Sequence, residues 1–364
     1  MAIVPTGGSF TLPFVARDEQ LFQMWEYLHS NHDNLLGGNQ PVKVSAQRTP
    51  IMYFQASPGV GKTRLLLELC RSDPKDSITW TSMPRPHFLP ISFNGVTSIS
   101  LAELDIVSRL DLSYLPLAIL RVVYTEACTA DRVSWLEFVA VAKKSLVSGE
   151  LKDVNHFGVA ALQNLLSARQ VGADVPKVFL VDEITKLDVA MVGAQAADTM
   201  RKMLSSLADD MRASVIFSTL DERVITRERA TPSNRRVKSL SLPLLPVENG
   251  TDLLQTIAIA TLQEVGLEEQ VDRELLRHGC RVLAAAGLGH GRTIEYMASA
   301  LKKEIIRQRL DWLAGDVFDS EPIIRAAISA VWETYGREAL APTEVLVAAV
   351  LGKLVRSGDI AFLR

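Results

Sequence analysis

The sequence predicts an α/β fold: a three-layer core built on a parallel sheet, followed by a mostly helical C-terminal domain. Five apolar runs of strand length lie between residues 50 and 242, and segments with helical patterning alternate with them. After Pro243 and Pro246 the composition changes, and from Gly250 onward almost every segment has helical periodicity. A glycine-rich loop directly after the first apolar run is the third observation, because such a loop joins a strand to a helix.

The elements follow from these patterns in order. Strands are expected at residues 50–55, 88–93, 177–182, 213–218 and 237–242, and early helices at 17–31 and 62–71. Residues 100–170 are mostly helical in pattern and form an elaboration of the core. Later helices are expected at about 250–266, 272–286, 290–311, 320–335 and 341–356. A short strand at 358–363 would make the end a winged helix, with a helical bundle as the alternative.

These elements divide the chain into three parts, and its composition limits the classes of protein it resembles. The parts are a leader and helix at 1–48, the core at 49–246, and the C-terminal domain at 247–364. A hydrophobic content of 48% and a charged content of 22% suit a globular core, and a net charge of −3 gives no overall basic field for nucleic acid.

Cysteine usage and the lack of long apolar runs indicate the compartment. Three scattered cysteines favour a reducing environment over disulfides or a zinc site. Because no secretory signal or run of 18 apolar residues occurs, an intracellular protein without a membrane partner is expected. Cytoplasm, nucleus and export by a non-standard route stay open.

The loop at 56–63 reads Ala-Ser-Pro-Gly-Val-Gly-Lys-Thr, the pattern G-x-x-x-x-G-K-[ST] with Ala56 at the first glycine. In such a loop, backbone N–H groups and a helix N-terminus bind phosphate, the lysine reaches the β- and γ-phosphates, and the threonine hydroxyl ligates Mg²⁺. Alanine suits the first position if its φ stays negative. The alternative is a chance glycine-rich turn. The expected nucleotide-binding residues are Ser57, Pro58, Gly59, Val60, Gly61, Lys62, Thr63 and Arg64.

A second motif, Lys-Val-Phe-Leu-Val-Asp-Glu at 177–183, reads as a strand buried on both faces that ends in two carboxylates. At the carboxyl end of a parallel strand, Asp182 is expected to hold Mg²⁺, directly or through water, together with Thr63. Glu183 is placed to act as the general base on the attacking water. The alternative is that the two acids only end the strand and open a turn.

Weaker polar signals follow downstream. Ser218, at the tip of the fourth strand, is expected to hold the lytic water or sense the γ-phosphate, unless it serves only to end the strand. A basic cluster at 223–238 includes Arg235 and Arg236, either of which can supply an arginine to the transition state. The same cluster also fits a nucleic-acid contact or a solvated loop.

A glycine-rich turn at 287–291 precedes Arg292 at the start of a helix in the C-terminal domain. From that place an arginine can reach the γ-phosphate and report the nucleotide state through a domain motion. The alternative is an exposed residue of the first helical turn.

The order of these motifs resembles the AAA+ and STAND-like branch of P-loop ATPases, a branch with a P-loop NTPase core. There the matching positions are Walker A at 56–63, Walker B with its glutamate at 182–183, sensor 1 at Ser218, an arginine-finger region at 223–238, and sensor 2 at Arg292. The segment 13–19 is similar to the motif that precedes the first helix in that branch, with Ala16 in place of a glycine.

A narrower likeness covers about residues 10–300. The segments YFQASPGVGKTRLL, LPISFNGVTS, VFLVDEITKL and RVKSLSLPLLP look like the NTPase domain shared by crinkler-type effectors and retrotransposon hot spot proteins. Residues 300–364 carry no nuclease signature, so the nuclease activity often coupled to that domain is not expected.

The leading interpretation is an ATPase that uses ATP and Mg²⁺ to drive a movement between the two domains or an assembly of several copies. The alternative is a nucleotide-gated module with little turnover that recruits a protein or nucleic-acid partner. A small-molecule kinase is disfavoured, because no arginine-rich acceptor segment follows the loop closely. ATP is the expected nucleotide, and the choice between adenine and guanine stays open. The sequence leaves open whether the chain forms a homo-oligomer and which protein partner it has.

Overall fold

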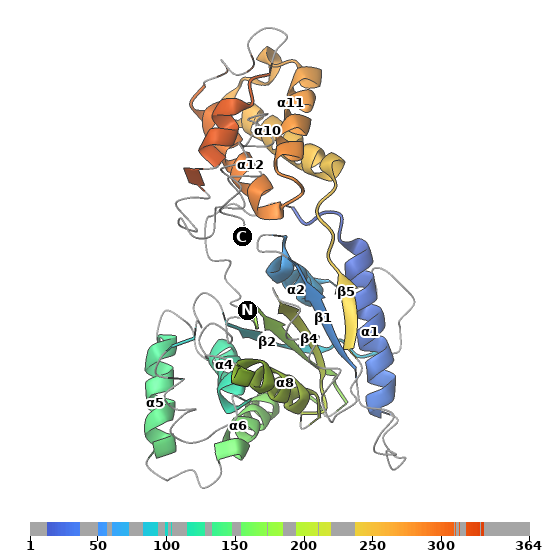
Figure 1. Cartoon of the computed structure of the whole chain (residues 1–364), viewed down its shortest axis with the longest axis vertical. Coiled ribbons are helices and arrows are strands. Elements are labelled where there is room, and N and C mark those ends of the chain that lie inside the picture. Colours follow the sequence, from blue (N-terminus) through green and yellow to red (C-terminus); the bar gives the residue numbers. More distant parts are fainter. Residues whose placement is uncertain are drawn as a thin grey trace. The chain divides into compact units, whose positions relative to one another are not determined.

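In a computed structural model of the chain, a five-stranded parallel sheet carries helices on its two faces (Figure 1). The structure describes residues 13–36, 50–56, 60–72, 83–93, 99–100, 103, 115–127, 133–147, 154–172, 174–184, 194–209, 211–219, 237–308, 310, 313, 318–327 and 329–330.

The strands are β1 (Ile51–Gln55), β2 (His87–Ser92), β3 (Lys177–Asp182), β4 (Ser214–Thr219) and β5 (Val237–Ser241). The helices before β5 are α1 (Asp18–Leu36), α2 (Lys62–Arg71), α4 (Leu115–Ala127), α5 (Trp135–Val147), α6 (Val154–Ala168) and α8 (Ala194–Asp209). Those after it are α10 (Val247–Val265), α11 (Arg273–Ala286) and α12 (Gly291–Ile306). A 3-10 helix, η4 (Glu268–Gln270), lies between α10 and α11, and residues 321–327 are helical.

The strand order is β2-β3-β4-β1-β5, with β4 between β1 and β3. Along the strands, alternate residues such as Phe179, Val181 and Phe217 share one core with α4, α5, α6 and α8. The residues between them, such as Leu180 and Ile216, are equally buried and point to the opposite face, because successive side chains of a strand alternate. Helices α1 and α2 pack against that second face, which gives three layers (Figure 1).

The predicted α/β class and parallel core are confirmed. Every strand lies within one residue of its expected bounds. Helix α1 continues to Leu36 rather than ending near residue 31, and α12 ends at Ile306 rather than at 311. The early end has a local cause, because Gln308 takes a left-handed φ of 56°, which a helix cannot continue through. The expected helix at 341–356 and strand at 358–363 lie outside the described residues.

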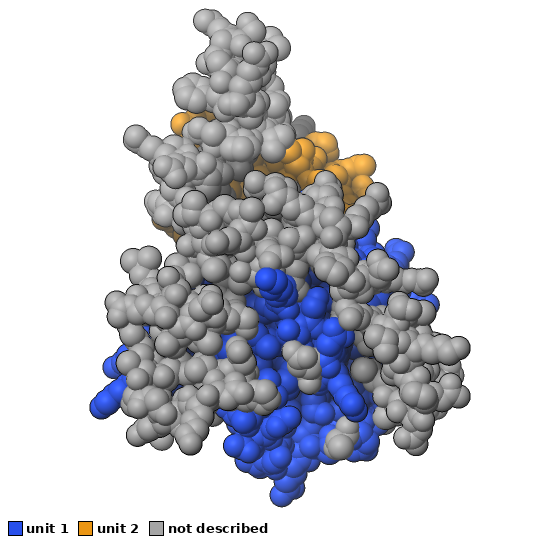
Figure 2. All heavy atoms as spheres, turned by 60° about the horizontal axis from the view of Figure 1, so that its bottom comes forward, with its two compact units in different colours: residues 1–6, 18–57, 62–242 blue, residues 7–17, 58–61, 243–364 orange. Residues whose placement is uncertain are grey.

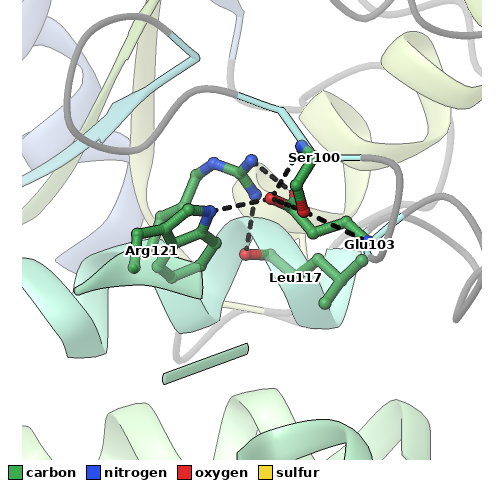
Figure 3. A network of polar contacts seen from close by, with 5 residues as sticks. Ser100, Glu103, Leu117 and Arg121 are labelled. Carbon is green, nitrogen blue, oxygen red and sulfur yellow. Dashed lines mark hydrogen bonds and ion pairs between the residues drawn. The ribbon is translucent and has the colours of Figure 1, made fainter. Parts of the chain in front are cut away.

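A fully buried ion pair lies within the helical elaboration (Figure 3). Arg121 of α4 donates to the carboxylate of Glu103 over 2.6 Å, and its guanidinium lies 4.9 Å from the ring centre of Phe93 and 4.8 Å from that of Trp135. Glu103 also accepts hydrogen bonds from the Trp135 indole N–H and the Ser100 backbone N–H. These bonds compensate both charges, which burial without partners would make very unfavourable.

The chain divides into two compact units (Figure 2). The described residues of the first lie within 18–56 and 62–242, and those of the second within 13–17, 60–61 and 243–330. In the second unit, α10, α11 and α12 share an apolar core that includes Leu254, Leu283 and Met297. None of the described helices is long and apolar enough to cross a membrane.

Cys70 and Cys280 are buried, as expected for core residues. Burial raises the pKa of both thiols to about 12, so both stay protonated at neutral pH and act as packing groups.

Candidate functional site

The two predicted motifs meet at one edge of the sheet, because β1, β4 and β3 are parallel neighbours. In the register, Phe54 of β1 pairs with Ser218 of β4, and Val181 of β3 pairs with Phe217. The backbone N–H of Ala56, just after β1, donates to the carbonyl of Thr219 over 3.4 Å. The end of β4 therefore joins the glycine-rich loop to the end of β3, at the edge where open parallel sheets bind their ligands.

The described part of the loop has the backbone features that phosphate binding requires. Ala56 keeps a negative φ, as expected for an alanine in place of the first glycine. Gly61 has a φ of +104°, and no atom lies within 4 Å of the position that a Cβ would take there. Helix α2 begins at Lys62, and its own first turn contains no acidic residue that would neutralise the positive N-terminus. Residues 57–59 lie outside the described residues.

Lys62 is held inside this loop. Its side chain is 5% exposed, and its ammonium donates a 2.7 Å hydrogen bond to the carbonyl of Ala56. Burial lowers the pKa of Lys62, while the charges of Glu183 and Asp182 act in the opposite direction. The buried ammonium thus lies at the loop, near enough to Glu183 and Asp182 for their charges to act on its pKa.

The Asp182 carboxylate accepts hydrogen bonds from two hydroxyl groups. Thr63, in the first turn of α2, donates to Oδ2 over 2.7 Å, and Ser218 donates to Oδ1 over 2.8 Å. Asp182 is 2% exposed. Burial raises the pKa of this carboxyl, and the two hydroxyl donors lower it in part. The structure therefore brings together Thr63 and Asp182, the two residues expected to bind metal.

Glu183 adopts an unusual backbone conformation directly after β3. Its φ is +54°, in the left-handed region that few residues other than glycine occupy. The backbone N–H of Glu183 donates to the hydroxyl of Ser218 over 2.9 Å, and the N–H of Ile184 donates to the Ser218 carbonyl over 3.3 Å. Ser218 therefore fixes the turn that carries the expected general base.

The donor set fits Mg²⁺ bound together with a phosphate ligand. Magnesium takes oxygen ligands, keeps several waters, and needs only one or two protein groups when substrate phosphates supply the rest. The Thr63 hydroxyl and the Asp182 carboxylate are oxygen donors in direct contact. Among the described residues, no group of three or more His, Cys, Asp or Glu side chains is placed to hold a metal on its own.

Of the four arginines expected at the site, the structure describes Arg64 and Arg292. Arg64 forms an ion pair of 2.8 Å with Glu68 along α2, and Arg292 one of 3.5 Å with Glu295 along α12. Arg292 belongs to the second unit, whereas Lys62 and Asp182 belong to the first. Arg235 and Arg236 lie outside the described residues.

The turn before Arg292 is bound to the segment that follows β5. Leu288 and Gly289 both have left-handed φ values, 48° and 70°. The carbonyl of Gly289 accepts a 2.8 Å hydrogen bond from the N–H of Leu245. A Cβ on Gly289 would lie 2.5 Å from the Leu245 carbonyl oxygen, so only glycine fits this close approach.

Arg17 is a candidate residue that the sequence reasoning did not single out as functional. It is 6% exposed, and its guanidinium donates to the carbonyl of Val60, in the glycine-rich loop, over 3.5 Å. Its Nη1 is buried without a hydrogen-bond partner among the described residues, and burial lowers its pKa. Ala16, at the glycine position of the preceding motif, has a φ of +54°. The sequence signal that could have marked Arg17 is its place directly after Ala16, which stands where the related motif has a glycine.

Comparisons with known proteins give structural matches only. No family profile matches the chain, and no curated protein matches it. The ORC2 protein of Aeropyrum pernix, in ADPNP–ADP complexes, is 13% identical with a TM-score of 0.46, over 98% of this chain and 81% of its own. Drosophila ORC bound to DNA is 14% identical with a TM-score of 0.45, and the match covers 89% of this chain and 69% of the Drosophila chain. The ORC1 protein of Aeropyrum pernix, in complex with DNA, is 14% identical with a TM-score of 0.43, and the match covers 97% of this chain and 77% of the ORC1 chain.

Proposed function

We propose that the protein binds ATP with Mg²⁺, hydrolyses it, and couples hydrolysis to a conformational change or an assembly. The observation that carries this proposal is the 2.7 Å hydrogen bond between Thr63 and Asp182. It joins a phosphate-type loop to a carboxylate at the end of a buried parallel strand, and the fit of this pair to Mg²⁺ supports a nucleoside triphosphate as the ligand.

Each residue of the site has a role that positioning and electrostatics can explain. The amides of the loop and the start of α2 would bind the phosphates, and Lys62 would exchange its bond to the Ala56 carbonyl for the β- and γ-phosphates. Thr63 and Asp182 would hold Mg²⁺, which neutralises charge on the phosphate oxygens when bound. Glu183 would orient the attacking water and accept its proton.

An arginine is the remaining part that phosphoryl transfer usually needs, because negative charge spreads over the γ-phosphate oxygens in the transition state. Arg292 is one candidate, and its pairing with Glu295 would have to be exchanged for the nucleotide. Arg235 and Arg236 are the others. An arginine of the second unit would make hydrolysis sensitive to domain movement, and an arginine from a neighbouring copy would make it sensitive to assembly.

We place the protein in the AAA+ and STAND-like branch of P-loop ATPases as part of this proposal. The order of motifs, and the sheet order that puts β4 between the loop strand and the Asp182 strand, support the placement. The narrower likeness to crinkler-type effectors and retrotransposon hot spot proteins stays a prediction from short motifs. A protein or nucleic-acid partner stays a prediction as well.

Steady-state phosphate release from the full chain tests the proposal, with ATP in the presence of Mg²⁺ or of EDTA. We expect release that requires Mg²⁺ and is abolished in Lys62→Ala, while Lys303→Ala, which removes an exposed lysine, keeps the parent rate. Size-exclusion with light scattering, with and without Mg²⁺–ATP, tests the assembly. Tight ATP binding without release would instead favour the nucleotide-gated module, and failure to bind ATP would contradict both functions.

A further inference from the structure

The hydroxyl of Ser218 already has protein partners on both sides. Its proton goes to Oδ1 of Asp182 over 2.8 Å, and its oxygen accepts the backbone N–H of Glu183 over 2.9 Å. The Ser218 carbonyl accepts the N–H of Ile184 over 3.3 Å. Ser218 is 0% exposed, so these contacts are made in the interior of the sheet edge.

A serine hydroxyl has one proton to donate, and a phosphate oxygen only accepts. Because the proton of Ser218 is used by Asp182, a bond from Ser218 to the γ-phosphate requires breaking a buried hydrogen bond to a carboxylate. That exchange would remove one of the two donors that hold Asp182. The arrangement therefore opposes direct sensing of the phosphate.

The same hydroxyl explains how Glu183 keeps its conformation. A φ of +54° is unfavourable for a glutamate, and such residues persist where the surrounding structure holds them. Two successive N–H groups are bound to Ser218: that of Glu183 to the hydroxyl, and that of Ile184 to the backbone carbonyl. The direction in which the Glu183 side chain leaves the backbone depends on this φ, so Ser218 controls it.

We infer that Ser218 is a positioning residue, which fixes the Asp182 carboxylate and the left-handed backbone of Glu183 and does not contact the nucleotide. The inference rests on the proposed function, because it gives Ser218 its effect through the general base. It replaces the role expected from the sequence, in which Ser218 touches the lytic water or the γ-phosphate.

The first test needs no nucleotide. Amide hydrogen exchange of the full chain is measured for the parent, Ser218→Ala and Ser214→Ala. Ser214 is the matched control, since it is a buried serine at the other end of β4, bonded to Asn31. We expect the Glu183 amide to exchange roughly tenfold faster in Ser218→Ala, because its acceptor is lost, and to keep the parent rate in Ser214→Ala.

The second test is the split between kcat and KM for ATP. A displaced general base lowers kcat, by roughly a hundredfold for a shift of about 1 Å, and leaves KM within about twofold. Ser218→Thr keeps the hydroxyl and should restore both the amide protection and kcat. If Ser218→Ala melts at a lower temperature than Ser214→Ala, Ser218→Cys replaces it, because the thiol fills the space of the lost hydroxyl and is only a weak acceptor.

Parent-like exchange of Glu183 in Ser218→Ala overturns the inference. A raised KM with an unchanged kcat also overturns it, because that result places the hydroxyl on the bound nucleotide. If the parent does not hydrolyse ATP, the proposed function fails, while the exchange measurement still decides whether Ser218 holds Glu183.

Discussion

Thr63 and Asp182, separated by 119 positions in the chain, are joined by a hydrogen bond of 2.7 Å. The bond connects the first turn of α2 to the end of β3. Any ligand bound by the loop is therefore in reach of a buried carboxylate. The sequence predicted a shared metal site for these two residues, and the structure brings their oxygen atoms into direct contact.

Replacing Thr63 separates the roles of its hydroxyl and its methyl group. Thr63→Ala leaves Oδ2 of Asp182 without its partner, which should destabilise the protein by about 1–3 kcal/mol. The Mg²⁺ concentration for half-maximal phosphate release should rise by about 10- to 100-fold, as for lost metal-site contacts elsewhere. Thr63→Ser keeps the donor and should stay close to the parent in both measurements. Equal losses in the two variants would show that the hydroxyl is not the important group.

The buried Asp182 should make stability depend on pH. Burial raises its pKa above the ordinary 3.8, so the folded protein holds this proton more tightly than the unfolded chain does. The contribution to stability is full below the unfolded pKa and is lost as pH rises through the folded pKa. Asp182→Asn removes that loss, and we expect a higher melting temperature than the parent at neutral pH.

The advantage of Asp182→Asn should shrink as the pH falls toward and below 4, because the parent carboxyl is then protonated too. Melting curves of the nucleotide-free protein over a pH series give the comparison, with Asp174→Asn, at an exposed position, as the control. A stability advantage of Asp182→Asn that grows toward acid pH would contradict a raised pKa of Asp182 in the folded protein.

Removing only one partner of the buried ion pair between Arg121 and Glu103 should lower the free energy of unfolding strongly. Arg121→Met leaves an uncompensated carboxylate and should destabilise the protein by about 3–5 kcal/mol in denaturant unfolding. Adding Glu103→Gln removes that charge and keeps an acceptor for Trp135, so the double variant should recover part of the loss. Arg325→Met, which breaks an exposed pair with Glu321, should change stability by less than about 1 kcal/mol. A double variant less stable than Arg121→Met would contradict this reading.

Two glycines with nearly equal φ values allow a matched comparison in the second unit. Gly266 has a φ of +71° with open space around it, while Gly289 has +70° with Leu245 backbone atoms within 3 Å of a Cβ position. Gly266→Ala should cost about 1–2 kcal/mol, for left-handed strain alone. Gly289→Ala adds a steric clash with the backbone and should lower the melting temperature further. Similar melting temperatures for both variants would contradict the tight contact.

Local sequence patterns were enough for the strands and for the contact residues of the site. The run at 177–182 is apolar and ends in an acid, and the loop at 56–63 has a fixed spacing. Each motif can therefore be recognised from a short contiguous segment of the sequence. Lys62, Thr63 and Asp182 come together in the structure because β1, β4 and β3 are neighbours, and their roles stay predictions.

Long-range polar contacts were beyond the sequence. Nothing in the local pattern of α4 marks Arg121 as fully buried, because its partners Glu103, Phe93 and Trp135 come from other segments. The left-handed φ of Glu183 is equally hidden, since it depends on a bond to Ser218 on another strand. Such features require knowing which segments meet, and composition and periodicity do not contain that information.

Comparing ATP binding and phosphate release in the parent and in Glu183→Gln tests most directly whether Glu183 is the general base. Glu269→Gln, an exposed carboxylate in the second unit, is the control. We expect Glu183→Gln to bind Mg²⁺–ATP with the parent affinity and to release phosphate at least about a hundredfold more slowly, because its amide cannot accept the proton of water. Release at the parent rate by Glu183→Gln would contradict the assignment of the general base and with it the proposed mechanism.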